Sequence, residues 1–337
     1  MSTVPFAFLL VACTGGGLTG QFYYEDGDYE RAREEFERAA AARPDDLVLS
    51  YWLGKTYAEL GEYTLMRDAW DRCLAHRLRY AEEIEDLLER YWSVQQAEGS
   101  SLMEATLADY HGALAAFHKA LAIQPGNAKS LHGLAYAYTV VDSVAQAQRI
   151  YRELAARNPA DLVAHQALGL AHMNVGRWDE AVGHFEQVVA LDPYDVVAMD
   201  RLGTVYEQLG RWADAVDICI QLVVLVPEAP QTRVRLGRQY EGLGDVESAA
   251  EAYQQALVLS PADPVALEHL ARLRMQQGDD EAALPLLELL TVRAPLERGL
   301  WLELARIYRE RGLPDHSAAA LEQARVLAPA KVDDLQP

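Results

Sequence analysis

Three histidines are the residues of this chain whose types and spacing are best suited to metal chemistry. His165 and His172 lie seven residues apart, which places both on one face of a helix, and His184 follows nearby. Imidazole is a common ligand of transition metals. His165 and His172, however, occupy positions that apolar or aromatic residues fill elsewhere in the chain. We therefore interpret them as packing residues and predict no metal site.

No other motif in the sequence indicates a catalytic site. The chain contains no phosphate-binding glycine loop, nucleophile elbow or His-Glu zinc helix. The acidic run from Glu82 to Glu89 lacks the alternating ligands and the turn glycine of a calcium loop, so we interpret it as a solvated helix face. We predict a protein that is not an enzyme and uses no cofactor.

Cys13 is the residue with the most specific candidate chemistry. The sequence Leu10-Val11-Ala12-Cys13 resembles the lipobox of a bacterial lipoprotein signal, which would make residues 1–12 a signal peptide and Cys13 the lipidated residue. No Lys or Arg precedes the apolar segment, and the segment is short. The alternative is that residues 4–12 cover the end of the folded chain. Cys73 and Cys219 are predicted to be small, buried core residues.

A repeat of 34 residues organises most of the chain. Prolines recur at this interval, and glycines lie halfway between them; the residues are Pro125, Pro159, Pro193, Pro227, Pro261, Pro295 and Pro329, with Gly176, Gly210, Gly244, Gly278 and Gly312. Glycine ends a helix in a left-handed conformation, and proline cannot continue a helical hydrogen-bond ladder. Each period therefore predicts two helices joined by a short turn.

Small and aromatic residues share this phase, as in LGTVYEQLGRWADAV and LGRQYEGLGDVESAAEAYQQALVLSP. These stretches resemble the tetratricopeptide repeat family. The resemblance implies an all-α, right-handed superhelical solenoid of about nine helical hairpins that binds other proteins along a concave groove. Pro285 is expected to distort or delay its helix, and Arg274 replaces the usual aromatic residue.

The phase also predicts the domain organisation. Two N-terminal units occupy residues 13–80, and an enlarged, irregular unit with an insertion at 81–93 occupies 81–127. Six regular units follow at 128–331, with a tail at 332–337. The regular units are expected to start at residues 128, 162, 196, 230, 264 and 298.

Arginines on the first helices are the candidate partner contacts. They are Arg201, Arg235, Arg238, Arg272, Arg306 and Arg309. Guanidinium groups pair well with carboxylates, so this strip is predicted to bind an acidic segment or an anionic polymer. The alternative is pairing within the chain, because Glu207, Glu241 and Glu303 lie at nearby positions, as do Glu268 and Glu310.

The net charge of −21 argues against nucleic acid as a partner, since phosphate backbones would be repelled. The leading hypothesis is a scaffold held by lipid at Cys13 in the outer membrane, facing the periplasm, that aids assembly of a secretion, pilus or envelope complex. The alternatives are a cytoplasmic adaptor or regulator, and an accessory module of polysaccharide biosynthesis or export.

Overall fold

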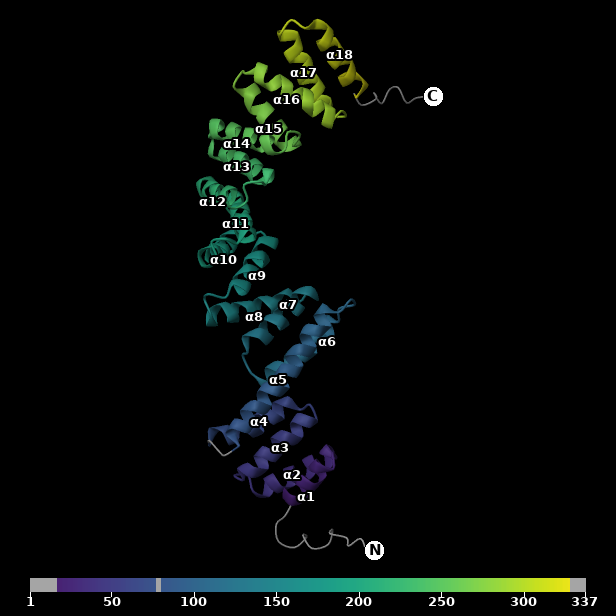
Figure 1. Cartoon of the computed structure of the whole chain (residues 1–337), viewed down its shortest axis with the longest axis vertical. Coiled ribbons are helices and arrows are strands. Elements are labelled where there is room, and N and C mark those ends of the chain that lie inside the picture. The colour runs from purple at the N-terminus through teal and green to yellow at the C-terminus, as the bar shows by residue number, and fades with distance from the viewer. Residues whose placement is uncertain (1–16, 77–79, 328–337) are drawn as a thin grey trace, which may run out of the picture. The chain divides into compact units, whose positions relative to one another are not determined.

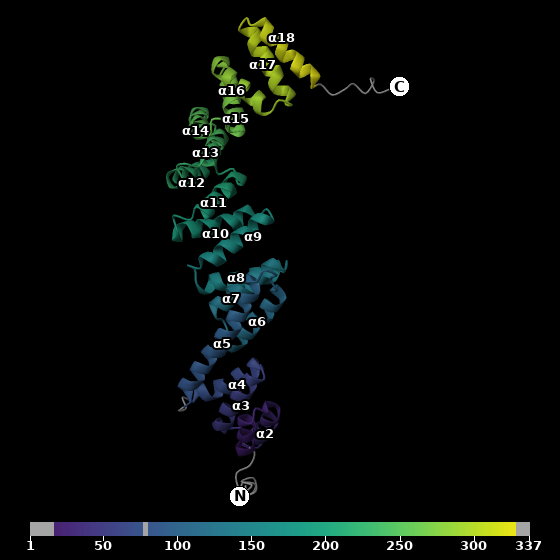
Figure 2. The same ribbon diagram turned by 45° about the vertical axis from the view of Figure 1, so that its right-hand side comes forward.

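The computed structural model describes residues 17–76 and 80–327, and this part of the chain forms 18 helices and no strands (Figure 1). The prediction of an all-α solenoid is confirmed. Consecutive helices pair as hairpins (Figure 2). The chain divides after Ala167 into two compact units, which are described separately below.

The first unit contains four hairpins. Its helices are α1 (Gly17–Glu25), α2 (Tyr29–Ala42), α3 (Leu47–Glu59), α4 (Tyr63–Ala75), α5 (Ala81–Glu104), α6 (Tyr110–Ile123), α7 (Ala128–Val140) and α8 (Val144–Arg157). The segment 81–93, which interrupts the repeat, is the first half of α5. This helix has 24 residues, against 9 to 14 in the other helices of the unit.

Helix α9 (Leu162–Asn174) contains the boundary between the units. The second unit continues with α10 (Trp178–Leu191), α11 (Val196–Gln208), α12 (Trp212–Leu225), α13 (Pro230–Leu243), α14 (Val246–Leu259), α15 (Pro264–Gln276), α16 (Asp280–Arg293), α17 (Arg298–Glu310) and α18 (Pro314–Val326). The first helices α7, α9, α11, α13, α15 and α17 begin at the residues that the 34-residue period gives.

Aspartates two residues after the periodic prolines start several of these helices. Pro193 precedes Asp195, whose carboxylate accepts a hydrogen bond from the backbone N–H of Ala198 at 2.9 Å. Asp263 accepts in the same way from Ala266 at 2.9 Å. These caps satisfy N–H groups that lack a partner in the first turn, which fixes where the helix begins.

The turns inside the hairpins use the left-handed conformation expected from the glycine column. All five predicted glycines have φ between 67° and 84°. In the hairpin of α7 and α8 the same repeat position holds Asp142, which adopts φ 59°. The repeat therefore imposes this backbone conformation even where no glycine is present.

Within a hairpin, glycine on the first helix lies against a large aromatic residue of the second. A Cβ atom at Gly169 would lie 2.8 Å from the ring of Phe185, and one at Gly237 would lie 2.7 Å from Tyr253. Both aromatic side chains are fully buried. The two backbones can thus pack closely because glycine has no side chain.

Tyrosines of the first helices contact the preceding hairpin. The hydroxyl of Tyr206 on α11 donates a hydrogen bond to Glu186 on α10 at 2.8 Å. Tyr57 donates to Glu37 at 2.9 Å and Tyr308 donates to Glu288 at 2.6 Å. The acceptor lies 20 residues before the tyrosine in every case, so one repeated contact joins successive hairpins.

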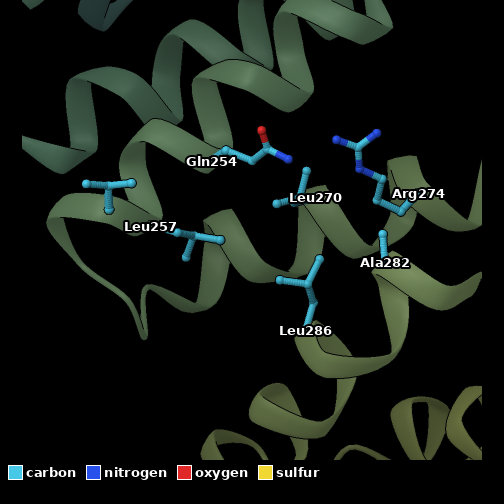
Figure 3. Close-up of a pocket in the computed structure, with 7 residues that line it drawn as sticks. Gln254, Leu257, Leu270, Arg274, Ala282 and Leu286 are labelled. Carbon is cyan, nitrogen blue, oxygen red and sulfur yellow. The ribbon is translucent and has the colours of Figure 1, made fainter. Parts of the chain in front are cut away.

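The eighth hairpin departs from this pattern at Arg274, which stands in the tyrosine position of α15. An open pocket of about 330 Å³ lies beside it (Figure 3). The expectation that Pro285 delays its helix is wrong, because α16 begins at Asp280 with a side-chain cap from Asp279. Pro285 is exposed, and the helix continues through it to Arg293.

Cys73 and Cys219 are fully buried free cysteines, as predicted. Cys13 and the 1–12 segment lie outside the described residues. No helix in the described ranges has the length and apolar character needed to cross a bilayer.

Candidate protein-interaction site

The six predicted arginines lie on four first helices of the second unit. We call this set the arginine face. Arg201 lies on α11, Arg235 and Arg238 on α13, Arg272 on α15, and Arg306 and Arg309 on α17. None of the six is buried. Their surroundings differ, and the differences decide which guanidinium groups are available to a partner.

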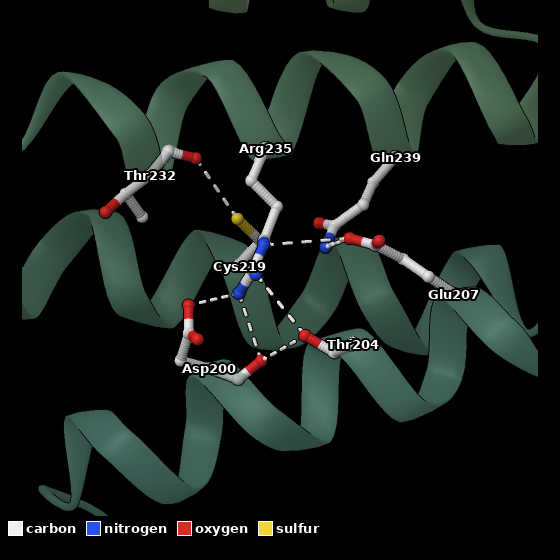
Figure 4. A network of polar contacts seen from close by, with 7 residues as sticks. All are labelled: Asp200, Thr204, Glu207, Cys219, Thr232, Arg235 and Gln239. Atoms are coloured by element: carbon white, nitrogen blue, oxygen red, sulfur yellow. Dashed lines mark hydrogen bonds and ion pairs between the residues drawn. The ribbon is translucent and has the colours of Figure 1, made fainter. Parts of the chain in front are cut away.

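Arg235 connects α13 to α11 (Figure 4). Its guanidinium forms an ion pair with Asp200 and lies 3.7 Å from a carboxylate oxygen of Glu207. It also donates to the backbone carbonyl of Asp200 at 3.0 Å and to the hydroxyl of Thr204 at 3.3 Å. Three residues of the neighbouring first helix thus hold this side chain.

A polar cluster extends from Arg235 into the protein interior. Gln239 is fully buried and donates to Glu207 at 3.0 Å. Cys219, whose thiol donates to the carbonyl of Thr232 at 3.3 Å, occupies the place of the aromatic residue in other hairpins. Burial raises the pKa of this thiol to about 12, so Cys219 stays protonated and unreactive at neutral pH.

Arg272 belongs to a second cluster between α13 and α15. It donates to Glu241, which also accepts hydrogen bonds from Tyr253 at 2.7 Å and from His269 at 2.7 Å. Burial opposes ionisation of Glu241, but the hydrogen bonds from Tyr253 and His269 outweigh it and lower the pKa of the carboxyl. Arg272 is therefore engaged inside the chain.

Arg306 is surrounded by carboxylates. It contacts Asp280 at 2.9 Å, Glu303 at 3.1 Å and Glu310 at 2.8 Å. The hydrogen bond from Arg306 is the main cause of the lowered pKa of Asp280. Three negative charges around one guanidinium make the local charge negative, so this part of the face does not attract an anion.

Arg201, Arg238 and Arg309 form no ion pair with any residue that the structure describes. Arg238 and Arg309 are exposed, and Arg201 is half-buried. Pairing within the chain, the alternative reading of the strip, thus accounts for three of the six arginines. Arg201 and Arg238 lie on the two helices that Arg235 joins.

Profiles of known families identify the repeats. Three profiles, each described as tetratricopeptide repeat, match residues 201–264, residues 163–195, and residues 23–64, 106–171 and 242–299. Together these ranges cover more than half of the chain. The chain belongs to the tetratricopeptide repeat family.

Solved structures of other tetratricopeptide repeat proteins resemble this chain at low sequence identity. No curated protein matches the sequence. A crystal structure of MamA protein is 20% identical and has a TM-score of 0.47, covering 52% of this chain and 96% of that one. A tetratricopeptide repeat protein from Parabacteroides merdae ATCC 43184 is 14% identical with a TM-score of 0.47, covering 71% and 94%. YrrB, described as a protein with an unusual peptide-binding site, is 17% identical with a TM-score of 0.45, covering 53% and 93%.

Tetratricopeptide repeats generally act as protein-interaction modules without catalytic activity, and no catalytic family matches this chain. Within the described ranges, no three His, Cys, Asp or Glu side chains form a group that could hold a metal ion. The rings of His172 and His184 stack with their centres 5.7 Å apart, which is a packing contact. These observations leave the surfaces of the tetratricopeptide hairpins as the candidate binding sites.

Four of the glutamates that the sequence offered as partners within the chain do pair with arginines of the face: Glu207, Glu241, Glu303 and Glu310. Three further partners were not predicted. Asp200 and Thr204 lie on α11, the preceding first helix, and Asp280 lies 26 residues before Arg306. One signal was present in the sequence: Gln239 is polar in a repeat position where the neighbouring units have Val205 and Leu273. A polar residue in an apolar column of a tetratricopeptide repeat indicates a buried hydrogen-bond partner.

Proposed function

We propose that this protein is a scaffold whose arginine face binds an acidic segment of a partner protein, with Arg201 and Arg238 as the main contacts. The observation that carries the proposal is a pair of guanidinium groups on α11 and α13 that form no ion pair with the described residues, on two first helices that Arg235 joins. Two guanidinium groups held on neighbouring helices can each form a charge-assisted hydrogen bond with a carboxylate.

The charge pattern favours a short acidic segment over a long anionic polymer. A polymer that followed the whole face would meet the carboxylates of Asp280, Glu303 and Glu310 around Arg306. These carboxylates would repel the negative charges of the polymer. A segment with two or three carboxylates, bound near Arg201 and Arg238, avoids them.

Charge reversal tests this proposal. A fluorescent eight-residue peptide with alternating Glu and Ala residues serves as the probe, and its affinity is measured by fluorescence anisotropy at low salt. We expect Arg201→Glu with Arg238→Glu to weaken binding at least tenfold, and added salt to weaken binding to the unmodified protein.

The matched control reverses two exposed arginines of second helices, Arg293→Glu with Arg325→Glu, which changes the net charge equally. Equal losses in both double variants would show that the peptide responds to overall charge. Either that result or no loss in the first variant would refute the proposal. Circular dichroism confirms that each variant is folded.

We also propose that lipid at Cys13 tethers the scaffold to the outer membrane, where it faces the periplasm and aids assembly of a secretion, pilus or envelope complex. The support is the sequence Leu10-Val11-Ala12-Cys13, followed by Thr14 in place of the Asp that retains lipoproteins in the inner membrane of many Gram-negative bacteria. The test compares the intact mass and membrane fractionation of the unmodified chain with those of Cys13→Ser.

Loss of residues 1–12, a lipid mass on Cys13 and release by Cys13→Ser would support the envelope role. An unprocessed chain in the soluble fraction would support the cytoplasmic adaptor instead. The outcome is independent of the peptide experiment, because the arginine face lies on helices far along the chain from Cys13.

A further inference from the structure

The pocket beside Arg274 is formed by three consecutive helices of the second unit (Figure 3). Leu257 from α14, Leu270 from α15 and Leu286 from α16 provide apolar walls, and Leu270 is buried. Gln254 and Arg274 supply the polar groups of the lining, and Val258 beside them is 80% exposed. The pocket is thus an apolar hollow of about 330 Å³, open to solvent, with an amide and a guanidinium at its edge.

The repeat explains why a hollow is present here. In other hairpins a tyrosine of the first helix donates its hydroxyl to the side chain 20 residues earlier, as Tyr206 does to Glu186 and Tyr308 does to Glu288. Arg274 on α15 and Gln254 on α14 occupy these two positions where the seventh and eighth hairpins meet. The pocket therefore lies where a phenol ring packs elsewhere in the same chain.

A small residue on α16 also borders the pocket. Ala282 lines the pocket, whereas the same repeat position in the next hairpin holds His316, whose ring lies 5.3 Å from that of Tyr308. Ala282 thus leaves space beside Arg274 that a larger side chain, such as that of His316, would occupy. The surrounding leucines have not moved in to fill the hollow.

The polar groups at the edge have unused hydrogen-bonding capacity. Arg274 donates to the amide oxygen of Gln277 at 3.1 Å and forms no ion pair with the residues that the structure describes. The side-chain amide of Gln254 makes no hydrogen bond within the same ranges. The edge therefore offers one uncompensated positive charge and one free amide.

We propose that this pocket receives a tyrosine side chain of a partner segment that carries a carboxylate next to the tyrosine. The ring would take the place of the missing aromatic residue against Leu257, Leu270 and Leu286, and its hydroxyl would donate to Gln254. The neighbouring carboxylate would pair with Arg274, whose guanidinium can also lie over the ring face. The proposal shares with the proposed function the premise of an interaction scaffold, but it uses a different surface.

The test uses the full chain labelled at leucine methyl groups and three pentapeptides. One has Tyr between two Asp residues, one has Ala in place of Tyr, and one has Asn in place of both Asp residues. Methyl NMR should show saturable shifts of the Leu257, Leu270 and Leu286 signals with the first peptide. We expect at least tenfold weaker binding of the Ala peptide and severalfold weaker binding of the Asn peptide.

Two variants test separately how the peptide's ring and the charge of Arg274 contribute to binding. Arg274→Tyr restores the repeat residue, fills the pocket and should abolish the shifts while the thermal midpoint stays equal or rises. Arg274→Gln keeps the hollow without the charge, so it should still bind Tyr peptides but lose the preference for Asp over Asn. Arg201→Glu with Arg238→Glu should leave these methyl shifts unchanged, which separates this pocket from the arginine face.

Any of the following outcomes would overturn the proposal. The first is equal binding of the Ala and Tyr peptides. The second is binding that survives Arg274→Tyr, or the absence of saturable shifts at these methyl groups in the unmodified chain. The third is a dimer, seen by size-exclusion chromatography, that Arg274→Tyr converts to a monomer, because a second copy of the chain would then be the occupant.

Discussion

The hydroxyl of Tyr308 on α17 donates a hydrogen bond of 2.6 Å to the carboxylate of Glu288 on α16. Burial, together with this hydrogen bond, raises the pKa of Tyr308 to about 12. Because Tyr57 and Tyr206 make the same contact with Glu37 and Glu186, the ionisation of these phenols is linked to the packing of successive hairpins.

This linkage predicts alkaline sensitivity. Tyr308 binds its proton more tightly in the folded chain than in the unfolded chain, where its pKa is about 10. Its stabilising contribution is complete below pH 10 and should be lost as the pH rises towards 12. We expect Tyr308→Phe to lower the urea midpoint less at pH 11.5 than at pH 8. An equal loss at both pH values would contradict this linkage.

Arg235 should contribute to stability, whereas Arg238 should not. Arg235→Ala removes contacts with Asp200, Thr204 and Glu207 and should lower the free energy of unfolding by about 1 kcal/mol. Arg238→Ala, on the same helix, removes no ion pair with residues 17–76 or 80–327 and should stay within about 0.5 kcal/mol of the unmodified protein. Urea unfolding of the two variants measures the difference, and equal stabilities would contradict the structural role of Arg235.

Two glycines of the same repeat position should respond oppositely to alanine. Gly237→Ala places a Cβ 2.7 Å from the buried ring of Tyr253 and should destabilise the protein by roughly 1–2 kcal/mol. Gly203→Ala meets its nearest atom, Nε2 of Gln239, at 3.6 Å, and should stabilise by up to about 1 kcal/mol through helix propensity. Thermal unfolding of both variants tests the contrast, and a loss of stability for Gly203→Ala would be the contradictory result.

Asp142 carries a conformational cost that glycine would remove. Its φ of 59° lies in the region that side chains with a Cβ disfavour, and Gly176 occupies the next equivalent position at φ 70°. We expect Asp142→Gly to raise the free energy of unfolding by up to about 1 kcal/mol and Asp142→Ala to lower it. Calorimetry of the two variants measures the difference in stability. Both variants lose the carboxylate, so the difference between them reports only on the backbone preference at this position.

The hairpins could be predicted because their determinants are local. Proline and glycine act on their own backbone, and capping aspartates such as Asp195 act within one helical turn. Repetition at 34 residues made each of these signals recognisable several times over. The sequence therefore determined the helical class, the turn positions and the starts of the regular first helices.

Contacts between helices decide whether each arginine is paired within the chain. Arg235 and Arg238 are three residues apart on α13, yet the first is held by α11 and the second has no ion pair within the described part of the chain. A few ångströms of side-chain position decide which carboxylate a guanidinium reaches, and the repeat period does not specify that position.

The sequence alone indicated that Arg274 replaces an aromatic residue, but not whether the space would remain open. Neighbouring side chains could have closed it, as Gln239 does beside Cys219 at the position of another missing ring. Around Arg274 the leucines stay on their own helices and leave a hollow. Tertiary packing decided this outcome, because the backbones of the hairpins are fixed by contacts along their whole length and do not collapse around a single missing ring.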